Sequence, residues 1–122
     1  MTYLTDIGEF LAALGYTPIY YFYLDESASN CIAITPYGGT EKTPVTGEKI
    51  TQPDIQIMIR NSDLNIAFTK ATEIYELLRT VYNSKIGSTR FMKITPKAPP
   101  GYIGRSTESG LHHISINFSV QY

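Results

Sequence analysis

The sequence lacks several features that would point to whole classes of protein. Cys31 is the only cysteine, so neither an internal disulfide nor a cysteine-based metal cluster can form within one chain. No apolar run approaches the roughly 20 residues that a membrane-spanning helix needs. The first residues lead directly into an acidic helix start and show no pattern of a secretory signal. These absences predict a soluble protein that has no membrane partner and stays in a reducing, cytoplasmic setting.

Charged residues are also scarce, and neither sign dominates. They make up 17% of the chain, and the formal net charge is -1. A dedicated nucleic-acid binder usually carries a basic excess or a basic stripe, so the charge argues against this class. The 122 residues are 43% hydrophobic, which suffices for one compact domain and leaves no room for a second. The ten tyrosines stand beside no tryptophan, and tyrosine is favoured at protein interfaces.

No set of residues in the sequence converges on catalysis. His112 and His113 are the only histidines, and neighbours on a strand point to opposite faces, so they cannot share one metal ion. Cys31 falls in an apolar stretch, where a thiol more often fills the core than acts as a nucleophile. The pair Gly101 and Gly104 superficially resembles a nucleic-acid clamp, but such a loop should join two helices and this one follows a proline-rich strand exit. We therefore expect no enzyme, and no catalytic, metal or cofactor site.

Apolar periodicity predicts two helices and five strands, in the order helix, three strands, long helix, two strands. This order is typical of an α+β domain in which a mostly antiparallel sheet of about five strands packs against two helices. We expect one such domain over residues 1–122. The predicted helices run from residue 6 to a stop at residue 15 and over 64–82, and the predicted strands cover 17–24, 31–35, 54–61, 90–97 and 112–122.

Local signals mark the helix ends. Asp6, with Glu9 three residues later, is typical of a capping box at a helix start, and Gly15 is a plausible stop. The run Asn61–Asp63 offers N-cap side chains for the long helix. That helix carries a single apolar stripe, which predicts packing against one face of a sheet. The stripe consists of Leu64, Ala67, Phe68, Ala71, Ile74, Tyr75, Leu78, Val81 and Tyr82.

Strict alternation in two strands predicts a buried and an outer sheet face. Ile55, Ile57 and Ile59 share one face of their strand. In the last strand Ile114, Ile116, Phe118 and Val120 point inward, while Ser115, Asn117, Ser119 and Gln121 form an uncharged outer face. That outer face either meets solvent or packs against a neighbouring subunit.

The remaining segments predict a hairpin and two long loops. The aromatic strand 17–24 and the strand 31–35 should pair as a hairpin with a longer loop. Residues Gly39–Gln52 and Lys97–Gly110 show no periodicity and are predicted to be loops. Each loop is either a tolerant piece of surface or a contact with a partner.

Taken together, several segments resemble a known family in their order and spacing. They are Ile7–Leu11 at the start, the strand Asp54–Arg60 leading into the long helix, Ile103-Gly104-Arg105, and Ile116–Val120 at the end. This arrangement is similar to the minor capsid or tail-terminator proteins of long-tailed (siphovirus-type) bacteriophages or prophages of Gram-positive bacteria, over nearly the whole chain. Where related chains often carry an aspartate-rich turn, this one has Ser106–Ser109, which leaves the contacts of that turn open.

The resemblance implies a structural subunit of the virion at the head–tail junction, assembled in the cytoplasm of the host bacterium. Such a subunit forms a ring, expected to be a hexamer, that caps the tail tube. Its partners would be the major tail protein and a head-completion or connector protein, with DNA only passing through the lumen and no cofactor. Candidate contacts with a neighbour or the tube are Lys42, Lys49, Arg60, Lys97, Tyr102 and Arg105, although scattered lysines usually only solvate a surface.

Three alternatives stay open at this point. A head-closure or connector minor capsid protein would dock on the head side and co-purify with heads. A small enzyme or ligand-binding α+β domain would require a polar pocket with a perturbed titratable group. A nucleic-acid-binding regulator would show a salt-dependent affinity for DNA.

Overall fold

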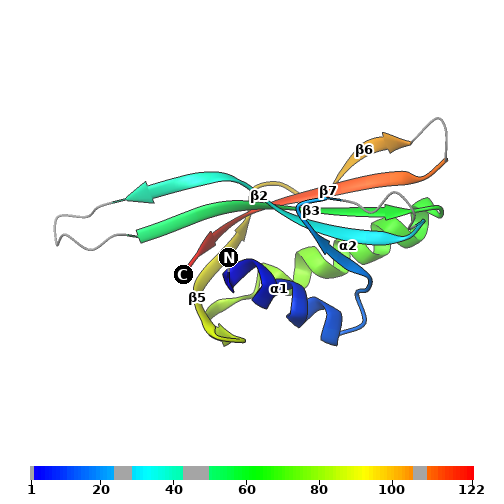
Figure 1. The fold of residues 1–122 in the computed structure, drawn as a ribbon. Coiled ribbons are helices and arrows are strands. Elements are labelled where there is room, and N and C mark those ends of the chain that lie inside the picture. The colour runs from blue at the N-terminus through cyan, green and yellow to red at the C-terminus, as the bar shows by residue number, and fades with distance from the viewer. Residues whose placement is uncertain (1, 24–28, 43–49, 106–109) are drawn as a thin grey trace.

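One seven-stranded sheet carries both helices on the same face in the computed structural model (Figure 1), which describes residues 2–23, 29–42, 50–105 and 110–122. The strand order is β1-β2-β3-β7-β5-β4, and β6 pairs with β7 beside this path. The α+β prediction is thus confirmed. The elements are α1 (Thr2–Ala13), β1 (Ile19–Tyr21), β2 (Cys31–Lys42), β3 (Ile50–Asn61), α2 (Leu64–Leu78), β4 (Tyr82–Ile86), β5 (Thr89–Pro96), β6 (Gly101–Arg105) and β7 (His112–Gln121).

The antiparallel pair β3–β7 forms the centre of the sheet. Its register sets Ile55 opposite Phe118 and Ile57 opposite Ile116, and none of these side chains is more than 1% exposed. Burying each such side chain stabilises the fold by about 1.5–3 kcal/mol. The alternation predicted for both strands is therefore confirmed, and the face that carries the isoleucines is the one that the helices cover.

Helix α2 begins where its cap predicts. The Asp63 carboxylate accepts hydrogen bonds from the backbone N–H groups of Asn65 (2.9 Å) and Ile66 (3.3 Å), which would otherwise lack partners in the first turn. The predicted end at Tyr82 is wrong, because the helix ends at Leu78 and Tyr82 begins β4. The fully buried residues of α2 are Ala67, Ala71, Ile74 and Leu78. Two members of the predicted stripe, Phe68 (37% exposed) and Tyr82 (73%), lie outside this buried face.

Helix α1 ends as predicted but starts earlier. Gly15 has a φ of 98°, and the N–H of Tyr16 donates to the carbonyl of Leu11 (3.1 Å), which is the closing bond of a Schellman motif. The predicted start at Asp6 is wrong, because the helix begins at Thr2 and Asp6 is a buried residue within it.

The Asp6 carboxylate instead joins α1 to the turn between β4 and β5. It accepts hydrogen bonds from the backbone N–H and the hydroxyl of Ser88 (both 3.2 Å) and from the hydroxyl of Thr89. Gly87, beside them in the turn, has a φ of 61°. A methyl group built on Gly87 would lie 2.3 Å from a carboxylate oxygen of Asp6, so the turn fits closely around this side chain.

Strand β1 pairs with β2 in parallel, so the predicted hairpin is wrong. Ile19 lies opposite Ile32 and Tyr21 opposite Ile34. The regular strand ends at Tyr21 because Phe22 has a φ of 76°, outside the extended region; residues 24–28 of the predicted hairpin lie outside the described part of the chain. The sheet is consequently mixed, with one parallel pair among antiparallel ones.

The predicted loop Gly39–Gln52 is wrong at both ends, because these residues extend β2 and β3 into a two-stranded ribbon. Thr40 pairs with Gln52 and Lys42 with Ile50, after an irregularity between Pro36 and Gly39. Strand β7 pairs with β3 only as far as Asp54, so no third strand pairs with this part of the ribbon among the described residues. Figure 1 shows the ribbon projecting at the left of the sheet. The middle of the predicted loop, residues 43–49, lies outside the described part of the chain.

Two further strands lie where the sequence predicts none. Strand β4 begins at Tyr82, the predicted last residue of the long helix, and pairs with β5 across a turn at Gly87 and Ser88. Strand β6 lies within the predicted loop Lys97–Gly110, pairing with the first half of β7, while β5 pairs with the second half. Pro99 and Pro100 lie between β5 and β6. Both strands pair with the same edge of β7, one after the other. Among the described helices, none is long and apolar enough to cross a membrane.

We expect Gly87→Ala to lower the free energy of unfolding by about 1–3 kcal/mol, because alanine is strained at this φ and its methyl group would meet the Asp6 carboxylate. Gly101→Ala is the matched control, since a methyl group there meets nothing within 4 Å, and it should change stability by less than about 0.5 kcal/mol. Urea unfolding followed by circular dichroism measures both. Equal stability of the two variants would contradict the account of this turn.

Candidate assembly surfaces

The sheet face away from the helices is polar, uncharged along β7, and only half exposed. Ser115, Asn117 and Ser119 alternate with the buried residues of β7 and are each partly buried. They lie opposite Met58, Gln56 and Asp54 of β3, respectively. The amide oxygen of Asn117 is buried and has no hydrogen-bond partner among the described residues. Such a face can either stay hydrated or pack against another protein surface.

Arg60 and His113 lie opposite each other at one end of this face. Arg60 is only 9% exposed, so most of its side chain is covered. Burial lowers the pKa of His113, and the positive charge of Arg60 lowers it further; backbone hydrogen bonds with Gly104 and Leu111 act in the opposite direction. The arrangement favours a neutral imidazole beside the guanidinium.

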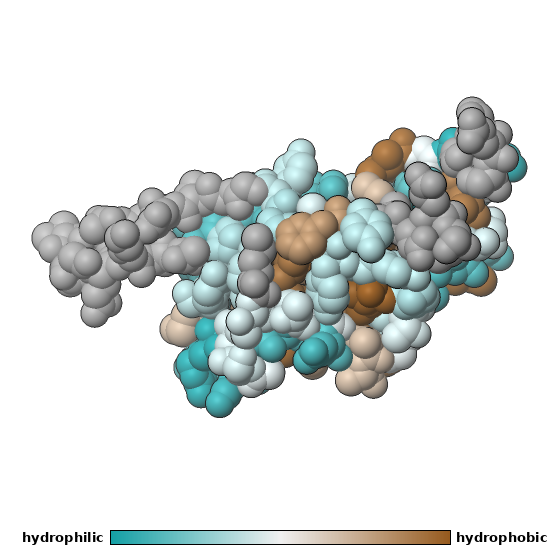
Figure 2. All heavy atoms as spheres, viewed as in Figure 1, coloured by the Kyte–Doolittle hydropathy of each residue, from teal (hydrophilic) through white to brown (hydrophobic). Residues whose placement is uncertain are grey.

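An aromatic cluster, made of Phe68, Tyr102 and His112, lies at the same end of the sheet. The Tyr102 hydroxyl lies 3.0 Å from Nδ1 of His112, and the Tyr102 and Phe68 rings are 6.5 Å apart. Tyr102 is 47% exposed and its neighbour Ile103 is 55% exposed. Figure 2 shows hydrophobic side chains at the surface over β6. Exposed aromatic groups of this kind are typical of protein interfaces.

The other candidate contact residues fall into separate places. Arg105 lies at the end of β6, where its Nε donates to the carbonyl of Gly110 (3.3 Å). Lys97 follows β5 and forms an ion pair with Asp54 of β3. Lys42 belongs to the ribbon, at the opposite end of the sheet from Arg105, and its side chain and all of Lys49 lie outside the described residues. The structure thus brings Arg60, Tyr102 and Arg105 to one end of the sheet and leaves Lys97 and Lys42 apart from them.

Two further observations concern a possible nucleic-acid clamp and a possible metal site. Gly101 and Gly104 lie within β6, not between two helices, so the rejected resemblance to a nucleic-acid clamp has no structural basis. No cluster of three or more potential metal ligands occurs among the described residues.

Sequence reasoning missed Phe68 and His112 as members of the exposed aromatic cluster. The signal that could have found Phe68 is its place one residue after Ala67, on the flank of the apolar stripe.

The lowered pKa of His113 predicts a pH-dependent stability. The unfolded chain binds a proton at the ordinary value of 6.5, whereas the folded protein binds it only at lower pH. Stability should therefore fall as the pH drops through 6.5 and should stop falling once the pH is below the folded pKa. His113→Gln should show a smaller loss over this range in urea unfolding between pH 8 and pH 5. The same pH dependence in the variant would contradict this assignment.

Comparisons with known proteins show which family this chain belongs to and which solved structure shares its fold. The family model described as Bacteriophage tail terminator protein matches residues 3–122. A chain in the solved structure "Virion of native gene transfer agent (GTA) particle" has the same fold, with a TM-score of 0.68, 16% sequence identity, and coverage of 91% of this chain and 82% of that one. Comparison with curated proteins gave no match. Because the family model covers nearly the whole chain, this protein belongs to the bacteriophage tail terminator family and is a structural component of a phage-like virion.

Proposed function

We propose that the protein assembles as a hexameric ring on the last ring of the tail tube, ends tube growth, and presents the surface that joins the head. The observation that carries the proposal is the family match over residues 3–122, on a fold shared with a virion protein. The partners are the major tail protein on one side and a head-completion or connector protein on the other. The role is structural and involves no catalytic step.

A closed ring requires two different patches on each subunit, because neighbours meet head to tail. The described part of the chain offers several distinct surfaces. They are the β2–β3 ribbon, the polar sheet face, the aromatic cluster around Tyr102, and the free edge of the sheet at β4. Free strand edges and projecting ribbons can add to a neighbour's sheet through main-chain hydrogen bonds. One chain can therefore supply both ring contacts and contacts with the tube.

We assign the tube and neighbour contacts to the ribbon that carries Lys42 and to the end of the sheet that carries Tyr102 and Arg105. The two lie at opposite ends of the sheet, and Tyr102 and Arg105 are exposed. DNA would pass through the lumen without a dedicated binding site, which is consistent with a formal net charge of -1. Assembly would take place in the cytoplasm of the host, in a long-tailed phage or prophage of a Gram-positive bacterium.

Purified protein should shorten the tubes that form when it is added to the polymerising major tail protein. A terminator blocks addition at one end, so the mean length should fall as the ratio of terminator to tube protein rises. Electron microscopy of negatively stained tubes measures the length distribution, and heat-denatured terminator serves as the control. Unchanged lengths at a molar excess of folded protein would contradict the proposal, and co-purification with heads in place of tails would favour a connector.

The ribbon should be needed for capping and not for folding. Replacing residues 40–52 by an Asn-Gly turn joins Gly39 to Pro53, which already lie opposite each other. Because the removed pairs lie beyond the reach of β7, we expect the free energy of unfolding to change by less than about 1 kcal/mol. The shortening of tubes should be lost. A shortened variant that caps tubes like the wild type would remove the ribbon from the contact surface.

A further inference from the structure

The charges of this chain are strongly segregated along the sequence, although their sum is nearly zero. Between Leu77 and Thr107 there is no carboxylate side chain, so this stretch is purely basic. Its cations are Arg79, Lys85, Arg90, Lys93, Lys97 and Arg105. All eleven acidic residues therefore lie in the rest of the chain. Two surfaces of opposite charge result from this division.

The first surface is the basic hairpin surface, formed on β4 and β5 by Tyr82, Lys85, Arg90, Met92 and Lys93. Lys85 and Arg90 lie directly opposite each other in the hairpin, and like charges in this position destabilise a sheet. No carboxylate lies within salt-bridge distance of the three cations among the residues that the structure describes. Tyr82 (73%) and Met92 (48%) add exposed apolar area. Figure 2 shows hydrophilic side chains around this hairpin at the lower left.

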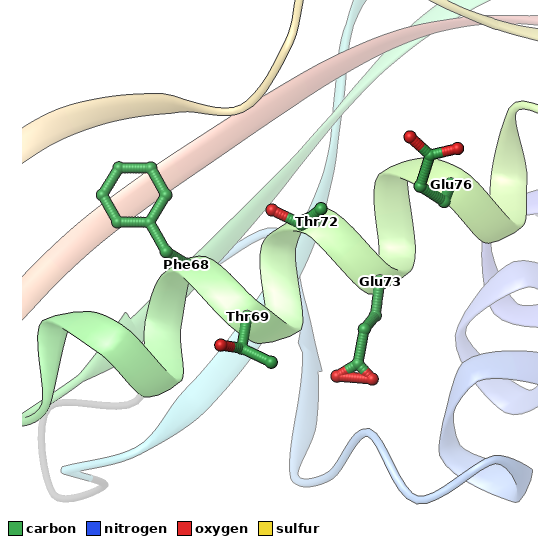
Figure 3. A pocket seen from close by; sticks show the side chains of 5 residues that line it. All are labelled: Phe68, Thr69, Thr72, Glu73 and Glu76. Atoms are coloured by element: carbon green, nitrogen blue, oxygen red, sulfur yellow. The ribbon is translucent and has the colours of Figure 1, made fainter.

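The second surface is the acidic α2 face, formed by Phe68, Thr72, Glu73, Glu76 and Leu77. Two adjoining shallow hollows run along it, of ≈ 440 Å³ and ≈ 630 Å³, and Glu73 and Glu76 line both. Figure 3 shows their carboxylates projecting from the helix on either side of its outer surface. The hydroxyl of Tyr16 donates to Glu73 (3.3 Å), which holds that side chain at the rim of the larger hollow.

The basic hairpin surface and the acidic α2 face differ in charge and lie on different elements of the fold. Each combines apolar side chains with charges: the hairpin carries three cations, whereas Glu73 and Glu76 line the hollows along α2. Glu76 also forms an exposed ion pair with Arg79 (3.5 Å). The hairpin includes β4, the strand at one end of the strand order in the described part of the chain, whereas α2 lies over the face of β3, β5 and β7. One subunit therefore carries the two surfaces on different elements, and a head-to-tail contact requires two different patches of this kind.

We propose that, in the ring of the proposed function, the basic hairpin surface of one subunit docks on the acidic α2 face of the next subunit. Lys85 and Lys93 then face Glu73 and Glu76, while Tyr82 and Met92 fill the hollows along α2. The repulsion between Lys85 and Arg90 is relieved by the neighbour's carboxylates, which favours the assembled state over the free subunit. The partner that this surface fits is a second copy of the chain.

DNA in the lumen is the competing occupant of the basic hairpin surface. Phosphate contacts use cations and backbone amides, so they would leave Tyr82 and Met92 without a role. A complementary acidic face on the same chain is also not expected for a DNA contact. The second copy therefore accounts for more of the observed side chains than DNA does.

Charge reversal tests the interface. The hairpin variant Lys85→Glu/Lys93→Glu and the helix variant Glu73→Lys/Glu76→Lys should each reduce the number of terminator rings on tube ends by about tenfold or more. The quadruple variant, with both surfaces reversed, should restore the rings. Glu9→Lys is the control, because it reverses an exposed charge on α1 that lies near Tyr21 of β1 and belongs to neither surface. Rings are counted by electron microscopy, and circular dichroism checks that each variant is folded.

Mixing the two double variants adds a sharper readout. Each repels its own copies, but alternating copies attract at every interface, so an even-numbered ring can close from the mixture. Zero-length carbodiimide cross-linking of wild-type rings should join Lys85 or Lys93 to Glu73 or Glu76 between subunits, as identified by mass spectrometry. Cross-links from these lysines only to other carboxylates would overturn the proposal, and so would a quadruple variant that fails to restore rings while remaining folded.

Two further outcomes separate the possible failures. Hairpin variants that form normal rings but lose DNA retention in filled particles would overturn the proposal in favour of a DNA contact. If the wild-type protein caps tubes and every charge variant caps them equally well, the interface is wrong and the terminator role stands. If the wild-type protein leaves tube length unchanged, the terminator role itself fails, whatever the cross-links show.

Discussion

The pairing of β3 with β7 determines how the helices and the other strands pack. It lines up Ile55, Ile57 and Ile59 with Phe118, Ile116 and Ile114, so that one sheet face is apolar enough to hold both helices. A shift of one residue would exchange these side chains for polar ones, and burial therefore sets the register. The same pairing turns polar side chains to the opposite face. In the described part of the chain, no further strand pairs with the outer edge of β4 or with the far part of the β2–β3 ribbon. The surfaces available for assembly follow directly from this arrangement.

The fold was predictable where an element's own pattern coincides with its burial. The isoleucine alternation of β3, the alternation of β7 and the Asp63 cap of α2 are such cases. Prediction failed where neighbours hold an element in place. Strand β6 (Gly101–Arg105) has no alternation and exists because β7 pairs with it, and β4 buries only Ile86. The predicted helix start at Asp6 failed for a related reason. A carboxylate is typical of a helix start, but this one accepts hydrogen bonds from a turn that is distant in sequence.

The assembly surfaces were harder to predict than the fold. Choosing candidates by charge and residue type found Tyr102 and Arg105, which the structure places on one exposed strand, but it also found Arg60, which is largely covered. The opposition of Lys85 and Arg90 is a property of strand register, and it is invisible until β4 is known to exist. The long stretch without carboxylates after Leu77 was readable from the sequence. Its meaning depends on the acidic helix face, which only the packing of α2 reveals.

The bond between Asp6 and the β4–β5 turn has a consequence for synthesis on the ribosome. Asp6 and Ser88 are 82 residues apart in sequence. Helix α1 therefore leaves the ribosome long before the residues that donate hydrogen bonds to Asp6. In a chain that stops short of Ser88, the carboxylate would lack these donors in a position that the complete protein buries, which disfavours folding of the fragment. Truncated products would therefore be degraded by proteases and would not be incorporated into virions. One defective subunit could otherwise prevent the assembly of a whole particle.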